Sequence, residues 1–110
     1  MRANDALVLW QQVLTRSVRQ EGPDLSARQM AILLSVYVEV GPHTVKGLAA
    51  DLAISKPAVT RALDTLSQMG LIKRRRAPDD KRNVLIERTL DGTQFLSNQA
   101  EIMMTVLDRR

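Results

Sequence analysis

Basic side chains gather in one quarter of the chain, where they could form a surface for a polyanion. Residues 56–82 hold eight Lys and Arg residues against three Asp residues, whereas the whole 110-residue chain has a formal net charge of +4 and a pI near 10.1. The basic residues are Lys56, Arg61, Lys73, Arg74, Arg75, Arg76, Lys81 and Arg82. This concentration makes a nucleic acid the first partner to consider.

The first part of this segment, "SKPAVTRALDTLSQM", predicts a helix with one apolar face and one polar face. Ser55 is a suitable N-cap, and a proline is tolerated in the first turn. The apolar face holds Val59, Ala62, Leu63 and Leu66, and the polar face holds Ser55, Lys56, Thr60, Arg61, Asp64 and Gln68. Hydroxyl and cationic groups near a helix N-terminus can reach base edges in the major groove and attract phosphate. The predicted DNA contacts here are Ser55, Lys56, Pro57, Thr60 and Arg61.

The second part, "LIKRRRAPDDKRNVLIERTL", changes to a strand-like pattern and predicts a β-hairpin with a charged tip. We expect Arg74, Arg75 and Arg76 to contact phosphates and fix the register on DNA. Lys81 and Arg82 lie at the tip. Arginine suits that position because its weakly hydrated guanidinium enters a narrow groove of enhanced negative potential.

Helices on both sides must position these residues. Residues 3–20 predict a first helix, with Leu7, Trp10, Leu14 and Val18 at helical spacing. A capping box, Ser26 with Gln29, begins a second helix that ends before Gly41-Pro42, although valines 36, 38 and 40 would also suit a strand. Thr44 caps a short third helix through Leu52 and is a further candidate for a phosphate contact. A last helix starts at Thr89 or Asp91, and its apolar residues are Phe95, Ile102, Met103, Val106 and Leu107.

This order predicts an α+β fold that is mostly helical, a winged helix-turn-helix with N- and C-terminal flanking helices. We expect a DNA-binding core at residues 25–90. The flanking segments, residues 1–24 and 91–110, each carry an apolar stripe that one small core would not bury fully. They are therefore expected to form a homodimer interface.

Residues 25–92 resemble the DNA-binding core of the multiple-antibiotic-resistance regulator (MarR) family. The resemblance is strongest in "KGLAADLAISKPAVTRALDTLSQMGLI" and in "RRAPDDKR", whose Asp80-x-Arg82 is similar to the family's Asp-x-Arg signature. It implies a dimeric transcriptional regulator, more often a repressor than an activator, with Arg82 in the minor groove and Asp80 bracing it. The family also implies a small-molecule effector, which the sequence leaves undefined.

Other classes of protein find less support. The chain has no cysteine, which fits a reducing cytoplasm, and its only histidine, His43, is expected in a loop. It offers no apolar run of membrane-spanning length, no phosphate-binding glycine loop, and no nucleophile paired with a base, so we expect no membrane association, no cofactor and no enzyme. Two alternatives remain: a winged module that binds an acidic protein, and a non-specific nucleic-acid binder. The absence of aromatic residues from 56–90 disfavours single-strand stacking.

Overall fold

A computed structural model describes residues 1–80 and 82–109, so the expectation for Lys81 lies outside the described residues. The chain forms two compact units. One, the winged unit, comprises residues 25–93, and the other, the flanking unit, combines residues 1–24 with the chain from residue 94 onward. Among the described residues, no helix has both the length and the hydropathy needed to cross a bilayer.

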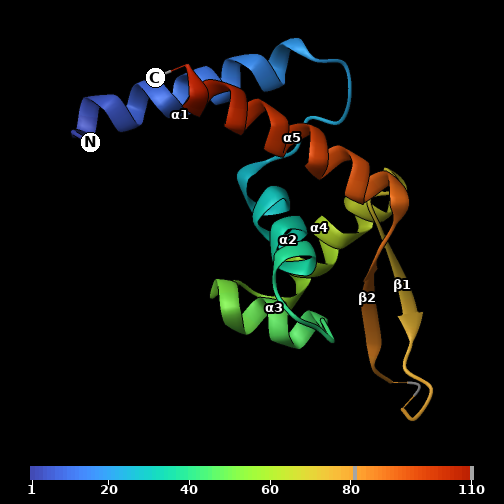
Figure 1. Cartoon of the computed structure of the whole chain (residues 1–110). Coiled ribbons are helices and arrows are strands. Elements are labelled where there is room, and N and C mark those ends of the chain that lie inside the picture. The colour runs from blue at the N-terminus through green and yellow to red at the C-terminus, as the bar shows by residue number, and fades with distance from the viewer. Residues whose placement is uncertain (81, 110) are drawn as a thin grey trace. The chain divides into compact units, whose positions relative to one another are not determined.

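Three helices of the winged unit begin where their capping residues predict. These are α2 (Ala27–Val38), α3 (Val45–Leu52) and α4 (Lys56–Gln68), shown in Figure 1. Ser26 Oγ accepts a hydrogen bond from the Gln29 amide at 3.1 Å, and the Gln29 side chain accepts one from the Ser26 amide at 2.9 Å. Thr44 and Ser55 cap α3 and α4 in the same way, so all three predicted caps are confirmed.

The hairpin follows a break at Gly70, whose φ of +76° lies in the region that favours glycine. Strands β1 (Ile72–Arg76) and β2 (Val84–Arg88) pair antiparallel, with Arg74 opposite Ile86. The Ile86 amide also donates to the His43 carbonyl at 2.9 Å, so the segment before α3 forms a short bridge to the outer edge of β2. The expected loop at His43 is therefore tied to the sheet, which anchors the base of the hairpin.

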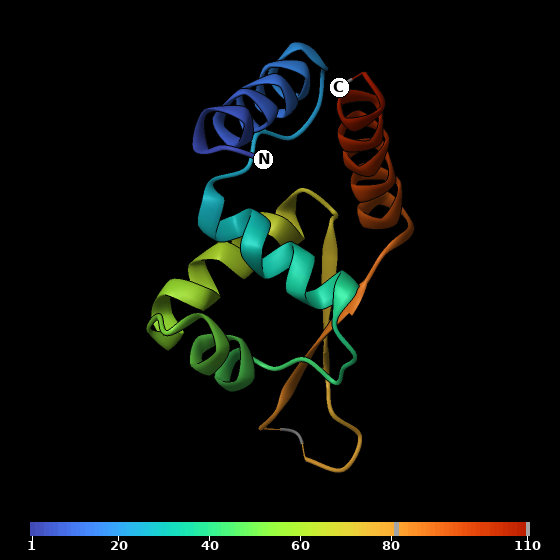
Figure 2. The ribbon, with the colours of Figure 1, turned by 60° about the vertical axis from the view of Figure 1, so that its left-hand side comes forward.

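The core of the winged unit comes from every one of its elements. Its most deeply buried side chains are Ile32, Leu33 and Val36 from α2, Leu48 from α3, Val59, Leu63 and Leu66 from α4, Ile72 from β1 and Ile86 from β2. The predicted apolar face of α4 is therefore confirmed. The hairpin extends beyond these packed helices, as Figure 2 shows.

A polar junction joins α2, the two strands and the start of α5 (Leu90–Asp108). The Tyr37 hydroxyl donates to the Leu71 carbonyl at 2.7 Å and accepts from the Thr89 amide at 2.9 Å. Thr89 Oγ1 caps α5 by accepting a hydrogen bond from the Gly92 amide. The guanidinium carbon Cζ of Arg88 lies 5.7 Å from the centre of the Tyr37 ring, a cation–π contact. One tyrosine thus fixes the point where the hairpin turns into the last helix.

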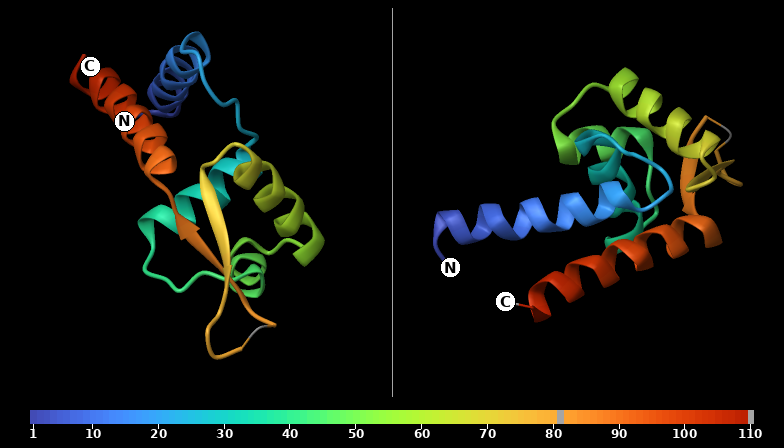
Figure 3. Two further views of the ribbon diagram at one scale, coloured as in Figure 1. Left: turned by 90° about the vertical axis from the view of Figure 1, so that its right-hand side faces the viewer. Right: turned by 90° about the horizontal axis from the view of Figure 1, so that it is seen from above.

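The flanking unit contains α1 (Ala3–Arg19) and most of α5, which run antiparallel in the right-hand view of Figure 3. The Ser17 hydroxyl donates to Gln99 Oε1 at 3.0 Å, linking the two helices. Ile102 and Val106 of α5 are buried, whereas α1 has no buried residue. Its predicted stripe is exposed: Leu7, Trp10, Leu14 and Val18.

Candidate nucleic-acid interface

Helix α4 presents a polar surface because its apolar face is fixed in the core. The side chains on the opposite face from the buried ones are exposed: Lys56, Pro57, Thr60 and Arg61. Ser55 and Thr44 are occupied as N-caps, each accepting from a backbone amide three residues on. An N-cap hydroxyl still has a proton to donate, so both can contact a phosphate without losing the cap. The structure thus brings the predicted α4 contacts onto one face.

The tip of the hairpin holds Arg82 in a defined turn. Asp80 Oδ1 accepts from the Arg82 amide at 3.0 Å and lies 3.5 Å from Arg82 Nε, while the Asp80 carbonyl accepts from the Asn83 amide at 3.0 Å. The Arg82 side chain is 94% exposed. Asp80, to which the family resemblance gives the bracing role, therefore contacts Arg82, and the guanidinium remains accessible to a partner.

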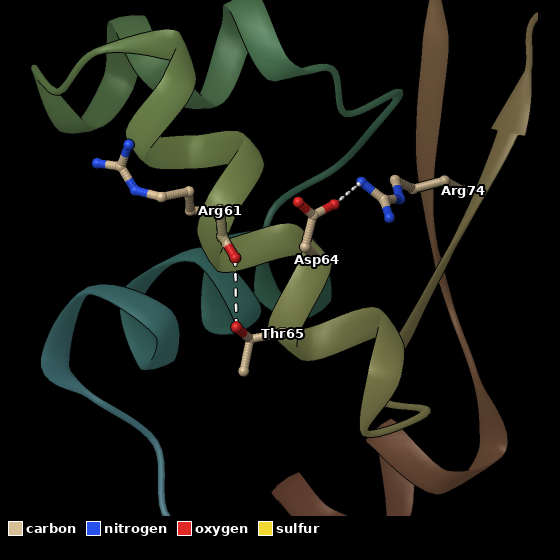
Figure 4. A network of polar contacts seen from close by, with 4 residues as sticks. All are labelled: Arg61, Asp64, Thr65 and Arg74. Atoms are coloured by element: carbon tan, nitrogen blue, oxygen red, sulfur yellow. Dashed lines mark hydrogen bonds and ion pairs between the residues drawn. The ribbon is translucent and has the colours of Figure 1, made fainter.

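The strand arginines differ from one another in their contacts. Arg74 Nη1 lies 2.7 Å from Asp64 Oδ1 of α4, a contact drawn in Figure 4. Arg75 donates from Nε and Nη2 to one oxygen of Glu87 on the neighbouring strand, at 3.1 and 2.9 Å. The two side chains lie on opposite faces of the hairpin because successive strand residues alternate. Arg74 and Arg75, both predicted to contact phosphate, are therefore paired with carboxylates.

The ion pair on β1 and β2 shifts both pKa values. The hydrogen bond from Arg75 is the main cause that lowers the pKa of the Glu87 carboxyl; desolvation opposes it, and the charges of Arg75 and Lys73 lower it further. The hydrogen bond to Glu87 and its negative charge raise the pKa of Arg75. Because the Glu87 pKa is lowered on folding, the stabilisation from this pair is present above the unfolded pKa and is lost as pH falls through the folded value.

Sequence reasoning missed two acidic partners and one junction residue. Asp64 was placed on the polar face of its helix with no partner, and Glu87 and Tyr37 had no assigned role. A sequence signal exists only for Glu87, since a carboxylate across from basic residues on one face of a hairpin is favourable; the register places it opposite Lys73 and diagonal to Arg75. Within the described part of the chain, no three His, Cys, Asp or Glu side chains come together in a way that could hold a metal ion.

Comparison with known proteins decides the family. A family model described as the MarR family matches residues 25–84, more than half of the chain. The chain belongs to the MarR family. This family is one of transcriptional regulators rather than enzymes, and the match covers α2, α3, α4 and most of the hairpin of this MarR-family chain. The predicted family and the predicted winged helix-turn-helix fold are both confirmed.

Relatives of this MarR-family chain include two bacterial regulators. It is 39% identical over 69 residues to the multiple antibiotic resistance protein MarR of Salmonella typhimurium, covering 63% of this chain and 47% of that protein. It is 36% identical over 64 residues to the organic hydroperoxide resistance transcriptional regulator of Bacillus subtilis, covering 58% of this chain and 44% of that protein. The chain thus matches less than half the length of each.

Solved structures share the fold over nearly the whole chain. The YusO protein of Bacillus subtilis has a TM-score of 0.79 and 22% identity, covering 97% of this chain and 74% of that one. The transcriptional regulator Tm0710 of Thermotoga maritima has a TM-score of 0.78 and 20% identity, covering 96% of this chain and 72% of that one. These likenesses extend the MarR-like fold beyond the matched core to the flanking helices.

Proposed function

We propose that this chain binds double-stranded DNA sequence-specifically and represses transcription. It acts in the cytoplasm, where DNA is accessible to it. The observation that carries the proposal is the exposed polar face of α4, held outward by the burial of Val59, Leu63 and Leu66. In this mode α4 enters the major groove and the hairpin reaches the adjacent minor groove. Net positive charge in residues 56–82 favours the approach of DNA of any sequence.

Roles divide between groups that read bases and groups that hold the backbone. Thr60 and Arg61 lie one turn into α4, where they can reach base edges, and Arg61 is suited to guanine because its guanidinium can bind two acceptors at once. Ser55, Lys56 and Pro57 at the start of α4, with Thr44 at the start of α3, contact phosphate and sugar. Arg82, braced by Asp80, enters the minor groove, with Lys81 beside it in the sequence, and Arg76 contacts phosphate.

A homodimer would complete the regulator. Helix α1 buries none of its residues, and its four stripe residues are between 49% and 78% exposed. Met103, Met104 and Leu107 of α5 are about half exposed in the same unit. A second copy would cover this apolar surface in a two-fold arrangement, in which each protomer offers the same patch. Two recognition helices would then lie about 34 Å apart, one turn of DNA.

Binding-site selection from a pool of randomised duplexes tests specificity and dimerisation together. We expect one enriched inverted repeat, because two-fold symmetry in the protein imposes the same symmetry on its site. Sedimentation at micromolar concentration is expected to show a dimer. Recovery of no preferred sequence would contradict specific binding and favour a non-specific binder, whereas a single unrepeated half-site with a sedimenting monomer would contradict the dimer.

Replacing Arg82 by alanine is expected to weaken binding to the selected site several-fold. One lost phosphate or groove contact would make the dependence of log K on log salt shallower by about 0.9 per protomer. Fluorescence anisotropy over a range of salt concentrations measures both quantities. Arg28→Ala is the control, because it removes the same charge from the exposed first turn of α2. Equal affinity and slope for Arg82→Ala and Arg28→Ala would show that the tip makes no contact.

A further inference from the structure

One acidic residue lies on the face of α4 that the proposed function turns toward DNA. Asp64 follows Arg61 by three residues and is exposed. An unpaired carboxylate there would repel the phosphate backbone. Its Oδ1 instead accepts a hydrogen bond from Arg74 Nη1 at 2.7 Å. The negative charge of the recognition helix is thus matched by a positive charge from the hairpin.

The Arg74 side chain is held at this place by the hairpin register. Arg74 lies two residues after the buried Ile72 and directly opposite the buried Ile86, so the backbone at Arg74 is anchored to the core on both strands. Figure 4 shows Arg74 leaving the strand toward Asp64, while Arg61 points away from Asp64. The ion pair therefore joins the middle of α4 to the base of the hairpin and leaves Arg61 available.

The exposure of the pair indicates what it contributes. The side chain of Arg74 is 34% exposed and that of Asp64 is 51% exposed. Ion pairs at such exposure add little to folding stability because water screens them. Their effect on a polyanion is larger, since each unpaired arginine near DNA can neutralise a phosphate and release a counterion. Pairing removes Arg74 from that role.

We infer that Asp64 is a positioning residue, which acts by holding Arg74 against α4 and away from the phosphate backbone. The inference rests on the proposed DNA binding. It revises the expectation that Arg74 contacts phosphate. A regulator gains from this arrangement because phosphate contacts strengthen binding to every sequence, whereas discrimination comes from base contacts. Asp64 thereby lowers the sequence-independent part of the affinity, so a larger share of the binding free energy comes from base contacts.

The Asp64→Asn variant tests this directly, since asparagine keeps the shape and removes the charge that holds Arg74. Anisotropy is measured on the selected site and on a scrambled duplex of equal length, between about 0.05 and 0.2 M salt. On the scrambled duplex we expect binding to tighten about threefold to tenfold and the salt slope to steepen by about 0.9 per protomer, as one phosphate contact is gained. Binding to the selected site should tighten by a similar factor, because a phosphate contact is independent of sequence.

Two further variants separate charge from position. Asp51→Asn makes the same change of charge on the exposed surface of α3, where Asp51 has no ion pair with any described residue, so it should leave the slope unchanged. The double variant Asp64→Asn/Arg74→Gln should return the slope to the wild-type value. The inference is overturned if Asp64→Asn and Asp51→Asn give the same slope and the same affinity for the scrambled duplex.

Arg74→Gln keeps the test decisive if Asp64→Asn does not fold. An unchanged salt slope for Arg74→Gln supports the inference, because Arg74 then makes no phosphate contact in the wild type. A slope shallower by about 0.9 overturns it. If the wild-type protein binds neither duplex, the proposed function is contradicted. If the wild type binds but Asp64→Asn behaves like Asp51→Asn, only this inference is contradicted.

Discussion

Replacing Gly92 by alanine is expected to lower the free energy of unfolding by about 3 kcal/mol. A Cβ at this position would overlap the Tyr37 hydroxyl oxygen and the Leu71 carbonyl oxygen, and it would lie 2.6 Å from Tyr37 Cζ. Relief requires the hydroxyl to move, which breaks its hydrogen bonds to Leu71 and Thr89. Urea denaturation followed by circular dichroism measures the loss.

Gly47→Ala provides a matched control for this prediction. Gly47 is the third residue of α3, as Gly92 is of α5, but a Cβ there would meet only the Thr44 hydroxyl, at 3.2 Å. The free energy of unfolding of Gly47→Ala should stay within about 1 kcal/mol of the wild-type value, because the helix propensity of alanine offsets the tight contact. The double variant Tyr37→Phe/Gly92→Ala should lose less stability than the sum of the losses in the two single variants. A wild-type unfolding midpoint for Gly92→Ala would refute the steric argument.

Replacing Arg61 by alanine is expected to weaken binding to the selected site about 10-fold to 100-fold, equivalent to about 1–3 kcal/mol. Arg61 is exposed on α4 and has no ion pair with any described residue. Its backbone carbonyl accepts from the Thr65 hydroxyl at 3.3 Å, a contact that the substitution leaves in place. Alanine is also a strong helix former, so the fold should be retained. Anisotropy on the selected site measures the loss.

The scrambled duplex distinguishes base reading from phosphate contact at Arg61. If Arg61 reads a base, the variant should lose much less affinity for scrambled DNA, and a repeated selection should show relaxed preference at one position in each half-site. Gln68→Ala is the control, since Gln68 is exposed near the end of the same helix. Equal losses on both duplexes would contradict base reading, and wild-type affinity for the selected site would contradict any contact by Arg61.

Much of the fold follows from local signals. The caps at Ser26, Thr44 and Ser55 start helices where the sequence predicts them, because each satisfies backbone amides of its own first turn. The valines at 36 and 38 fall within α2 rather than in a strand, in agreement with the capping box and the helix length. Burial of Val59, Leu63 and Leu66 follows from helical periodicity alone.

The partners of the charged residues do not follow from local signals. The basic run on β1 predicts phosphate contacts along the strand, yet Asp64 pairs with Arg74 and Glu87 pairs with Arg75. The contact between Asp64 and Arg74 depends on how α4 crosses the base of the hairpin, and Tyr37 joins segments that are 34 and 52 residues away.

The sequence by itself determined the family, the order of the elements, and the concentration of positive charge in residues 56–82. These depend on residue type and on spacing within one turn or one strand, which the chain displays directly. Only the tertiary structure decided which of those charges is paired and where α5 is anchored. Such contacts lie between elements, where a shift of a few ångströms in packing makes or removes an ion pair while the sequence pattern stays the same.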